Sequence, residues 1–254
     1  MLKAQNLSLK IDDKIILHPL DLEFKSGKIY GLIGHNGSGK SSLIKILAKQ
    51  QKEYQGSVFL DNKNIKKYHS KEFAKKVAYL PQILPDTSYL NGFELVSMGR
   101  YAHQSGFLRD RLKDNNIVIK CLKITKTLNF KDQEVQTLSG GEKSRLFLAM
   151  LLAQESKFLL LDEPLAPLDI SYQIEVMNLI SKLCKELKIG IIIVIHDINL
   201  ASLYCDKLIA LKNGNIVFND DAKNVMNKDK LEQIYGIQAY IIDHPIKNQP
   251  IAIF

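Results

Sequence analysis

A short glycine-rich segment places the strongest constraint on the fold of this chain. Gly34-His-Asn-Gly-Ser-Gly-Lys-Ser41 matches the pattern GxxxxGK[ST], between an apolar strand expected over residues 28–33 and an amphipathic helix. Glycines let the backbone wrap closely around phosphates, and the N–H groups at the start of the helix face the anion. We expect Lys40 to reach the β- and γ-phosphates and the Ser41 hydroxyl to coordinate Mg²⁺. The alternative, a glycine-rich turn that binds nothing, is disfavoured because the flanks and all four fixed positions are present.

Two carboxylates follow a second apolar strand, over residues 158–161. Asp162 is expected at the carboxyl end of this strand, beside the phosphate loop, where it would contact Mg²⁺ directly or through water. Glu163 could accept the proton of an attacking water as a general base. His196 follows another apolar strand, over 191–195, and is placed for a contact with the γ-phosphate. A surface turn with acidic caps would explain the carboxylates alone, but their occurrence together with a phosphate loop favours a nucleotide site.

The order of the expected elements indicates an α/β fold. Short apolar stretches in the first 30 residues predict antiparallel strands, and residues 84–155 are expected to be mainly helical. Fully apolar strands that alternate with helices predict a parallel sheet covered on both faces. Residues 212–215 predict a hairpin turn, followed by two short helices and a final strand. An amphipathic helix over 170–188 has a predicted apolar stripe of Ile170, Ile174, Met177, Ile180, Cys184 and Leu187.

Composition excludes few functions. The 35 Lys and Arg against 27 Asp and Glu give a net charge of +8, which would suit an anionic partner or a solvated lysine surface. The second reading is favoured because no block of five or six lysines occurs. No apolar run approaches the roughly 20 residues that a membrane span needs, and the first residues lack the apolar segment of a secretory signal. Three widely spaced cysteines without a CxxC pair argue against a disulfide framework or a structural zinc site and favour a reducing compartment.

A second glycine-rich helix start occurs at Leu138-Ser-Gly-Gly-Glu142. It is expected to form a second anion site, which would serve a partner chain because it cannot easily reach the first site within one chain. Together with the phosphate loop, Gln82, Asp162-Glu163, Leu168-Asp169 and His196, this motif resembles the nucleotide-binding subunit of ATP-binding cassette transporters. The ordered motifs extend the resemblance over nearly the whole chain.

The resemblance implies a P-loop NTPase (RecA-like) core with an N-terminal antiparallel β subdomain and an inserted helical subdomain. A single domain would span residues 1–254, with 1–83 and 156–254 as the core and 84–155 as the helical subdomain. ATP and Mg²⁺ are implied as ligands, with Ser41, Gln82 and Asp162 at the metal. Glu163 and His196 are implied as catalytic residues, and Asp169 as a contact across a dimer. The implied nucleotide-binding residues are Gly34, His35, Asn36, Gly37, Ser38, Gly39, Lys40, Ser41, Ser42, Gln82, Ser139, Gly140, Gly141, Asp162 and Asp169.

Longer segments narrow the resemblance. Residues 75–82, 96–103 and 196–201 look like importers of iron–siderophore complexes, haem and vitamin B12. Residues 17–20, 31–36 and 231–236 are similar to the ATPase subunit of ferric hydroxamate (ferrichrome) importers. A soluble cassette ATPase that acts on nucleic acid or ribosomes is an alternative, but such proteins usually carry two cassettes or a long coiled-coil insertion.

The resemblance also implies partners and a location. The chain would bind transmembrane permease subunits and a second copy of itself, arranged head to tail around two ATP molecules. It would act with a substrate-binding protein indirectly, and no nucleic acid is expected. It would lie at the cytoplasmic face of the cell membrane as a peripheral subunit, and its partners, rather than this chain, would select the chelate.

Two positions depart from the family pattern. Ile11 stands where the family often has an aromatic residue that stacks on adenine, while Tyr30 is expected in the core. Leu165 and Pro167 replace the small or hydroxyl residues usual before Asp169. A proline stiffens this loop, so the coupling across the dimer is expected to be altered while Asp169 is retained.

Overall fold

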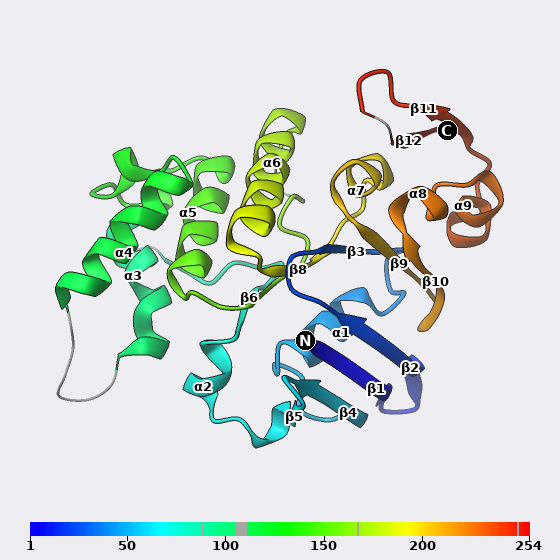
Figure 1. Ribbon diagram of the computed structural model, residues 1–254, viewed down its shortest axis with the longest axis horizontal. Helices are drawn as coiled ribbons and strands as arrows, with labels where there is room; N and C mark the ends of the chain where they lie inside the picture. Colours follow the sequence, from blue (N-terminus) through cyan, green and yellow to red (C-terminus); the bar gives the residue numbers. More distant parts are fainter. Residues whose placement is uncertain (88, 105–110, 167, 248) are drawn as a thin grey trace.

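The fold is built on a six-stranded sheet with the order β10-β9-β3-β8-β7-β6. We describe it from a computed structural model, which covers residues 1–87, 89–104, 111–166, 168–247 and 249–254. Strands β9, β3, β8, β7 and β6 run parallel to their neighbours, and β10 pairs antiparallel with β9 (Figure 1). The parallel sheet predicted from the apolar strands is confirmed. The strands are β3 (Ile29–Ile33), β6 (Val77–Leu80), β7 (Phe158–Leu161), β8 (Gly190–Val194), β9 (Lys207–Lys212) and β10 (Asn215–Asp221).

A second, antiparallel sheet has the order β2-β1-β4-β5. Strands β1 (Leu2–Ile11) and β2 (Lys14–Phe24) confirm the antiparallel pair predicted for the first 30 residues. Strands β4 (Gln55–Leu60) and β5 (Lys63–Asn64) extend this sheet and were not anticipated from the sequence. Their short length and polar content hide the alternation that identified β1 and β2.

Apolar side chains from both faces of the large sheet form two cores. Along β8, Ile191 and Ile193 belong to the core under the helices, while Ile192 and Val194 belong to the core shared with α1 and the antiparallel sheet. This alternation follows from the period of two in a strand. The large sheet is therefore covered on both faces, as the uniformly apolar strands predict. Helix α1 (Lys40–Leu47) and the short elements η1 (Ile65–Lys67) and α2 (Ser70–Ala74) lie on the side of the antiparallel sheet.

The helical region between β6 and β7 gathers beyond the β6 edge of the sheet (Figure 1). Its buried Arg100 donates to Asp114 at 2.9 Å, to Glu155 at 2.7 Å and to the Ala153 carbonyl at 2.6 Å. These bonds join the start of α4 to the end of α5. The elements are α3 (Gly92–Met98), η2 (Gly99–His103), α4 (Arg111–Ile124), η3 (Leu128–Phe130), η4 (Val135–Thr137) and α5 (Gly140–Ala153).

Helix α6 (Ile170–Leu187) buries only the centre of its predicted apolar stripe. Met177, Ile180 and Cys184 are at most 2% exposed. In contrast, Ile170 is 76%, Ile174 41% and Leu187 48% exposed, although helical spacing places all three on the predicted apolar stripe. The prediction is wrong for these three residues, which lie in the first two turns and at the last residue of α6, where neighbouring elements leave the helix partly uncovered. The helix stops at Leu187 with Lys188 in the left-handed region, one residue short of the predicted end, and Gly190 opens β8.

The C-terminal region packs on helix α7 (Ile198–Tyr204) through a two-stranded ribbon. The Asn199 side chain donates to the Ala252 carbonyl at 2.9 Å and accepts from its N–H at 2.7 Å, and Ser202 donates to the Pro250 carbonyl at 2.7 Å. The ribbon replaces the single final strand that the sequence predicts. Its strands are β11 (Tyr240–Asp243) and β12 (Pro250–Ile253), preceded by α8 (Ala222–Val225) and α9 (Lys228–Tyr235). Within the described ranges, no helix is both long and apolar enough to cross a membrane.

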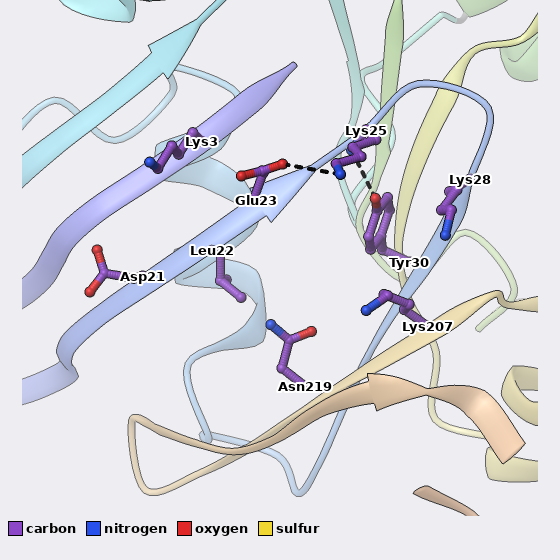
Figure 2. A pocket seen from close by; sticks show the side chains of 9 residues that line it. All are labelled: Lys3, Asp21, Leu22, Glu23, Lys25, Lys28, Tyr30, Lys207 and Asn219. Atoms are coloured by element: carbon purple, nitrogen blue, oxygen red, sulfur yellow. Dashed lines mark hydrogen bonds and ion pairs between the residues drawn. The ribbon is translucent and has the colours of Figure 1, made fainter. Parts of the chain in front are cut away.

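A polar crevice of about 510 Å³ separates the two sheets near the start of β3 (Figure 2). Tyr30 is buried, as the sequence predicts, and its hydroxyl accepts a hydrogen bond from the Lys25 N–H at 2.8 Å. The Lys25 ammonium lies 3.6 Å from Glu23. Further charged side chains line the same crevice, namely Lys3, Asp21, Lys28 and Lys207. This edge of the sheet is therefore rich in lysine.

Candidate nucleotide site

The phosphate loop connects β3 to α1, as its pattern predicts. Gly34 and Gly39 have φ of 130° and 104°, and a Cβ at these positions would lie 2.1 Å from the Leu211 carbonyl oxygen and 2.5 Å from Leu17. Only glycine fits both conformations without strain. Lys40 is buried, and its ammonium donates to the Gly34 and His35 carbonyls at 2.8 Å each. The loop is therefore folded around the lysine.

Burial also affects the protonation of Lys40 in the phosphate loop. Desolvation lowers the pKa of Lys40, while the carboxylates of Glu163 and Asp162 act in the opposite direction. An anion placed next to Lys40 would favour its charged form further. The Lys40 ammonium is therefore positioned to form an ion pair with a bound phosphate.

The β9–β10 hairpin closes one side of the loop. Asn213 and Gly214 both have positive φ, as a two-residue hairpin turn requires. The Gly214 N–H donates to the Ser38 carbonyl at 3.1 Å, and the His18 N–H donates to the Gly214 carbonyl at 2.9 Å. His35 Nε2 lies 3.0 Å from the Tyr235 carbonyl oxygen. The sequence predicts the hairpin but gives no sign that it supports the phosphate loop.

The two acidic residues after β7 have different surroundings. Asp162 is 1% exposed and accepts a hydrogen bond from Ser41 Oγ at 2.9 Å, and its second oxygen lies 3.5 Å from the Tyr79 hydroxyl. Burial raises the pKa of Asp162, and the Ser41 hydrogen bond partly offsets this effect. Burial and the nearby Asp162 carboxylate raise the pKa of Tyr79, so its hydroxyl stays protonated and can donate. Oxygen donors of this kind suit Mg²⁺.

Glu163 is held by two other predicted site residues. Gln82 Nε2 donates to one carboxylate oxygen at 2.7 Å, and His196 Nε2 lies 2.9 Å from the other. The Glu163 backbone has a φ of 51°, in the left-handed region that disfavours side chains with a Cβ. The strand end thus directs this carboxylate toward Gln82 and His196 at a local conformational cost.

These residues surround one cavity of about 640 Å³. Its lining includes Gln82, Glu163 and His196, together with residues 213–214 of the hairpin. The phosphate loop contributes Asn36, Gly37, Gly39, Lys40, Ser41 and Ser42, while Gly34, His35 and Ser38 shape the loop behind this surface. The structure thus brings together the predicted residues of the phosphate loop, the acidic strand end and His196.

The apolar wall of this cavity comes from β2 rather than from Ile11. Ile15 and Ile16 line the cavity together with Lys14, whereas Ile11 lies at the end of β1 and is about half exposed. Ile11 lies outside the lining of this cavity, and its place beside the adenine stays a prediction. Sequence spacing identified the correct strand pair but missed Ile15 and Ile16 because their side chains share a short apolar run with Leu17.

The second predicted anion site lies at the start of α5. Ser139 caps the helix, and its N–H and hydroxyl donate to Glu142 at 2.9 and 2.8 Å. These two hydrogen bonds lower the pKa of Glu142. Gly141 packs against the Tyr172 ring, where an added Cβ would lie 2.5 Å from a ring carbon. Within the described residues, Ser139, Gly140 and Gly141 lie outside the phosphate-loop cavity, so their service to a partner chain stays a prediction.

Asp169 caps the neighbouring helix α6. Its carboxylate accepts from the Tyr172 N–H at 3.0 Å and from the Ser171 hydroxyl at 2.9 Å, and these bonds lower its pKa. Leu165 is buried. Pro167, which was expected to stiffen this loop, lies outside the described residues. Asp169 therefore organises the start of α6, next to the helix start that carries Gly141.

Sequence comparisons place the chain among known proteins. A family model described as "ABC transporter" matches residues 17–166. The iron(3+)-hydroxamate import ATP-binding protein FhuC of Bacillus subtilis is 38% identical over 252 residues, which is 99% of this chain and 94% of that protein. The chain belongs to the ABC transporter family. The ferric enterobactin transport ATP-binding protein FepC of Escherichia coli is also 38% identical, over 99% of this cassette and 93% of that protein.

A solved bacterial ABC transporter cassette supports the same assignment. It is 27% identical to this chain, with a TM-score of 0.76, and the match covers 87% of this chain and 99% of the other. That cassette was solved as a dimer, and also in a post-hydrolysis state with ADP and phosphate. The α/β fold with a P-loop NTPase core, an antiparallel sheet and a helical insertion is therefore confirmed. This ABC cassette is an ATPase.

Proposed function

We propose that this ABC cassette hydrolyses ATP to drive import of an iron(III)–siderophore complex, with a hydroxamate chelate as the favoured cargo. The observation that carries the proposal is the 38% identity, over 99% of the chain, to an iron(3+)-hydroxamate import ATP-binding protein. A ferric enterobactin relative is equally similar, so the class of iron chelate is better supported than the individual compound. Haem and vitamin B12 importers are the alternatives within the same group.

The site geometry suggests how its residues act on ATP. Lys40 would pair with the β- and γ-phosphates that approach the loop, which offsets the lowering of its pKa by burial. Glu163 would accept a proton from the attacking water as the bond between the γ-phosphorus and its bridging oxygen breaks, which yields ADP and phosphate. Gln82 and His196 orient this carboxylate at 2.7 and 2.9 Å. His196 would also contact the γ-phosphate.

The residues at the expected metal position fit Mg²⁺. Ser41 Oγ and Asp162 Oδ1 are hard oxygen donors 2.9 Å apart. The Gln82 side chain uses its Nε2 to bind Glu163, and its carbonyl oxygen has no hydrogen-bond donor among the described residues. Ser41, Gln82 and Asp162 are the residues that would hold the ion. Mg²⁺ bound there would neutralise phosphate charge.

We propose partners that complete the site and couple it to transport. A second copy would contribute Ser139, Gly140 and Gly141 to the ATP bound by the first, with Asp169 near the contact between copies. This arrangement is supported by the dimeric cassette that is 27% identical. Transmembrane permease subunits would bind the helical region of 84–155, and a substrate-binding protein would act through them. The chain would then lie peripherally at the cytoplasmic face of the membrane.

Reconstitution tests the transport proposal. The cassette and its permease would be placed in lipid vesicles, and ATP hydrolysis measured with binding proteins loaded with a ferric hydroxamate, ferric enterobactin, haem or vitamin B12. We expect the ferric hydroxamate complex to stimulate hydrolysis most. Stimulation by haem or vitamin B12 alone would assign a different cargo, and hydrolysis that ignores every loaded binding protein would exclude the importer role.

The Glu163→Gln variant tests the catalytic assignment. It should bind ATP and dimerise, yet lose at least about 100-fold in hydrolysis because a neutral amide cannot accept the proton. The exposed Glu53→Gln variant is a matched control that should retain full activity. Normal hydrolysis by the Glu163 variant would show that another group is the base.

A further inference from the structure

A second cavity opens at the edge of the sheet opposite the phosphate loop. It has a volume of about 510 Å³ and reaches Ser26, Lys157 and Ile189, which directly precede or lie close to the starts of β3, β7 and β8. Helices α4 and α5 form its other side. The cavity therefore lies between the helical region and the sheet, at the amino ends of the parallel strands.

The walls of this cavity are mostly aliphatic. Helix α4 supplies Ile117 and Ile124, α5 supplies Leu151 and Leu152, and the sheet side adds Leu159. The volume falls within the range of roughly 300–1,000 Å³ typical of small-molecule sites, which are mostly apolar with a few polar groups. An alkyl chain of moderate length would be well matched to these walls.

Most charged groups at this cavity already have partners. Glu155 accepts from Arg100 at 2.7 Å, and Lys157 lies 3.0 Å from Asp61. The amine of Met1 also lies 3.0 Å from Asp61. Asp61 also contacts Lys76, so one carboxylate faces three cations, and this side of the cavity keeps an excess of positive charge.

Two lysines differ from this pattern. Lys120 on α4 and Lys188 at the end of α6 line the cavity, and within the described part of the chain their ammonium groups have no hydrogen bond or ion pair. Of the uncharged polar groups that line the cavity, the Ser156 hydroxyl already donates a hydrogen bond to the Ala74 carbonyl at 2.8 Å. Burial raises the pKa of Cys121 to about 11, so its thiol adds no charge. The unpaired charge at this cavity is therefore positive.

We propose that this cavity binds an aliphatic monocarboxylate, with the alkyl chain against the apolar walls and the carboxylate paired with Lys120 and Lys188. A simple inorganic anion would leave the aliphatic walls unused, and an uncharged alkane or alcohol would leave the two lysines unpaired. A medium-chain fatty acid satisfies both parts of the cavity. This binding does not depend on the transport function, because its residues lie apart from the phosphate-loop cavity.

Calorimetry with decanoate tests the proposal on the full chain. We expect decanoate to bind at least about 10-fold more tightly than decanol, because the alcohol cannot form the ion pairs. Lys120→Glu combined with Lys188→Glu should remove this preference. Lys123→Glu combined with Lys185→Glu is the matched control, since these exposed lysines lie on the same two helices outside the cavity lining and should leave it unchanged.

A cavity-filling variant provides a second test. Ile124→Trp should weaken decanoate and decanol alike by at least about 10-fold, because the larger ring occupies space that the alkyl chain needs. Circular dichroism and thermal unfolding would verify the fold of each variant. If the charge-reversed variant fails to fold, the decanoate-to-decanol ratio of the unaltered chain and the Ile124 variant still decide the question.

Several results would overturn the proposal. Failure of decanoate to bind, equal affinity for decanol, or decanoate binding that Ile124→Trp leaves intact would each exclude a site in this cavity. Binding to phosphatidylglycerol vesicles without binding of free decanoate would indicate a membrane contact instead. A preference for decanoate that survives charge reversal at Lys120 and Lys188 would show that these lysines do not hold the carboxylate.

Discussion

The carboxyl ends and the amino ends of the parallel strands form two opposite sides of the six-stranded sheet, called here the carboxyl edge and the amino edge. These two sides differ in their chemical character. At the carboxyl ends of β3, β7 and β8, Glu163 and His196 line one cavity with the phosphate loop, and Asp162 accepts a hydrogen bond from Ser41 of that loop. At the amino ends, lysines line the crevice of Figure 2, and a separate, mostly aliphatic cavity reaches the starts of β3, β7 and β8. The same strands thus present reactive polar groups at their carboxyl ends, and lysines with apolar walls at their amino ends.

Chain direction explains much of this difference. Helices α1, α6 and α7 begin after β3, β7 and β8 end, so helix N-termini gather at the carboxyl edge, where their N–H groups favour anions. Helices α5 and α6 end shortly before β7 and β8 begin, which brings helix C-termini to the amino edge. Lysines there are favoured by the partial negative charge of the helix ends. Parallel topology therefore separates catalysis from the lysine-rich edge.

Removal of one lysine at each edge should give the largest difference between two variants in ATP binding and hydrolysis. Lys40→Ala should weaken ATP binding and hydrolysis by about 100-fold or more, because the buried ammonium is aimed at the phosphates. Lys28→Ala, in the crevice of Figure 2, should leave both unchanged. Fluorescent ATP titration and phosphate release measure the two effects. Equal losses would show that the lysine-rich edge also contributes to the nucleotide site.

Substitution of two glycines by alanine separates a steric clash of the new Cβ from the cost of a positive φ angle. Gly141→Ala should lower the free energy of unfolding by about 1–3 kcal/mol, because the new Cβ meets the Tyr172 ring at 2.5 Å. Gly27→Ala has no neighbour within 4 Å but a φ of 77°, so it should cost about 1 kcal/mol from conformation alone. Urea unfolding measures both. Adding Tyr172→Ser should rescue Gly141→Ala, and a lack of rescue would contradict the steric explanation.

The ion pairs of Asp61 at the amino edge should contribute more to the free energy of unfolding than the exposed ion pair of Asp13 does, and this contribution should be lost in acid. Asp61 contacts Lys76 at 2.9 Å, Lys157 at 3.0 Å and the Met1 amine at 3.0 Å, and these contacts lower its pKa despite opposing desolvation. Asp61→Asn should therefore cost about 1–2 kcal/mol of unfolding free energy at pH 7. The exposed Asp13→Asn is the control and should have little effect.

The pH dependence of this loss follows from the lowered pKa. The stabilisation is complete above the unfolded value of about 4 and is lost as the pH falls toward the lower folded value. Unfolding measured from pH 7 to pH 3 should therefore show the Asp61→Asn variant approaching the unaltered protein. A difference that grows on acidification would rule out this assignment.

The smallest expected effect concerns backbone strain at Glu163. Its φ of 51° favours glycine, so Glu163→Gly should be about 1 kcal/mol more stable than Glu163→Ala. Both variants should have lost hydrolysis. Equal stabilities in urea would indicate that the backbone relaxes freely at this position, and the carboxyl edge would then hold no conformational strain there.

The sequence predicted those parts of the molecule that depend on local patterns. The phosphate loop, strands β3 and β7, and the hairpin at Asn213-Gly214 follow from glycine spacing and uniformly apolar runs. The exposed ends of α6 were mispredicted because spacing defines a helix face but not how much of that face neighbouring elements cover.

Contacts between distant segments could not be read from such patterns. The Tyr79 hydroxyl near Asp162, the Gly214 bond to the phosphate loop and the position of Ile15 and Ile16 depend on how separate strands pair. The aliphatic cavity at the amino edge is likewise formed by side chains that are scattered along the sequence. Residue type alone gives no signal for such a space.

The attachment of the C-terminal ribbon to α7 has a mechanical consequence. Asn199 and Ser202 fasten β12 to a helix that begins two residues after His196, so force applied to the ribbon would be transmitted to the neighbourhood of the histidine. A domain or tether fused after Phe254 could therefore shift the position of His196 in the nucleotide site. Engineered control of this ATPase by an external ligand could therefore start at the end of the chain farthest in sequence from the phosphate loop.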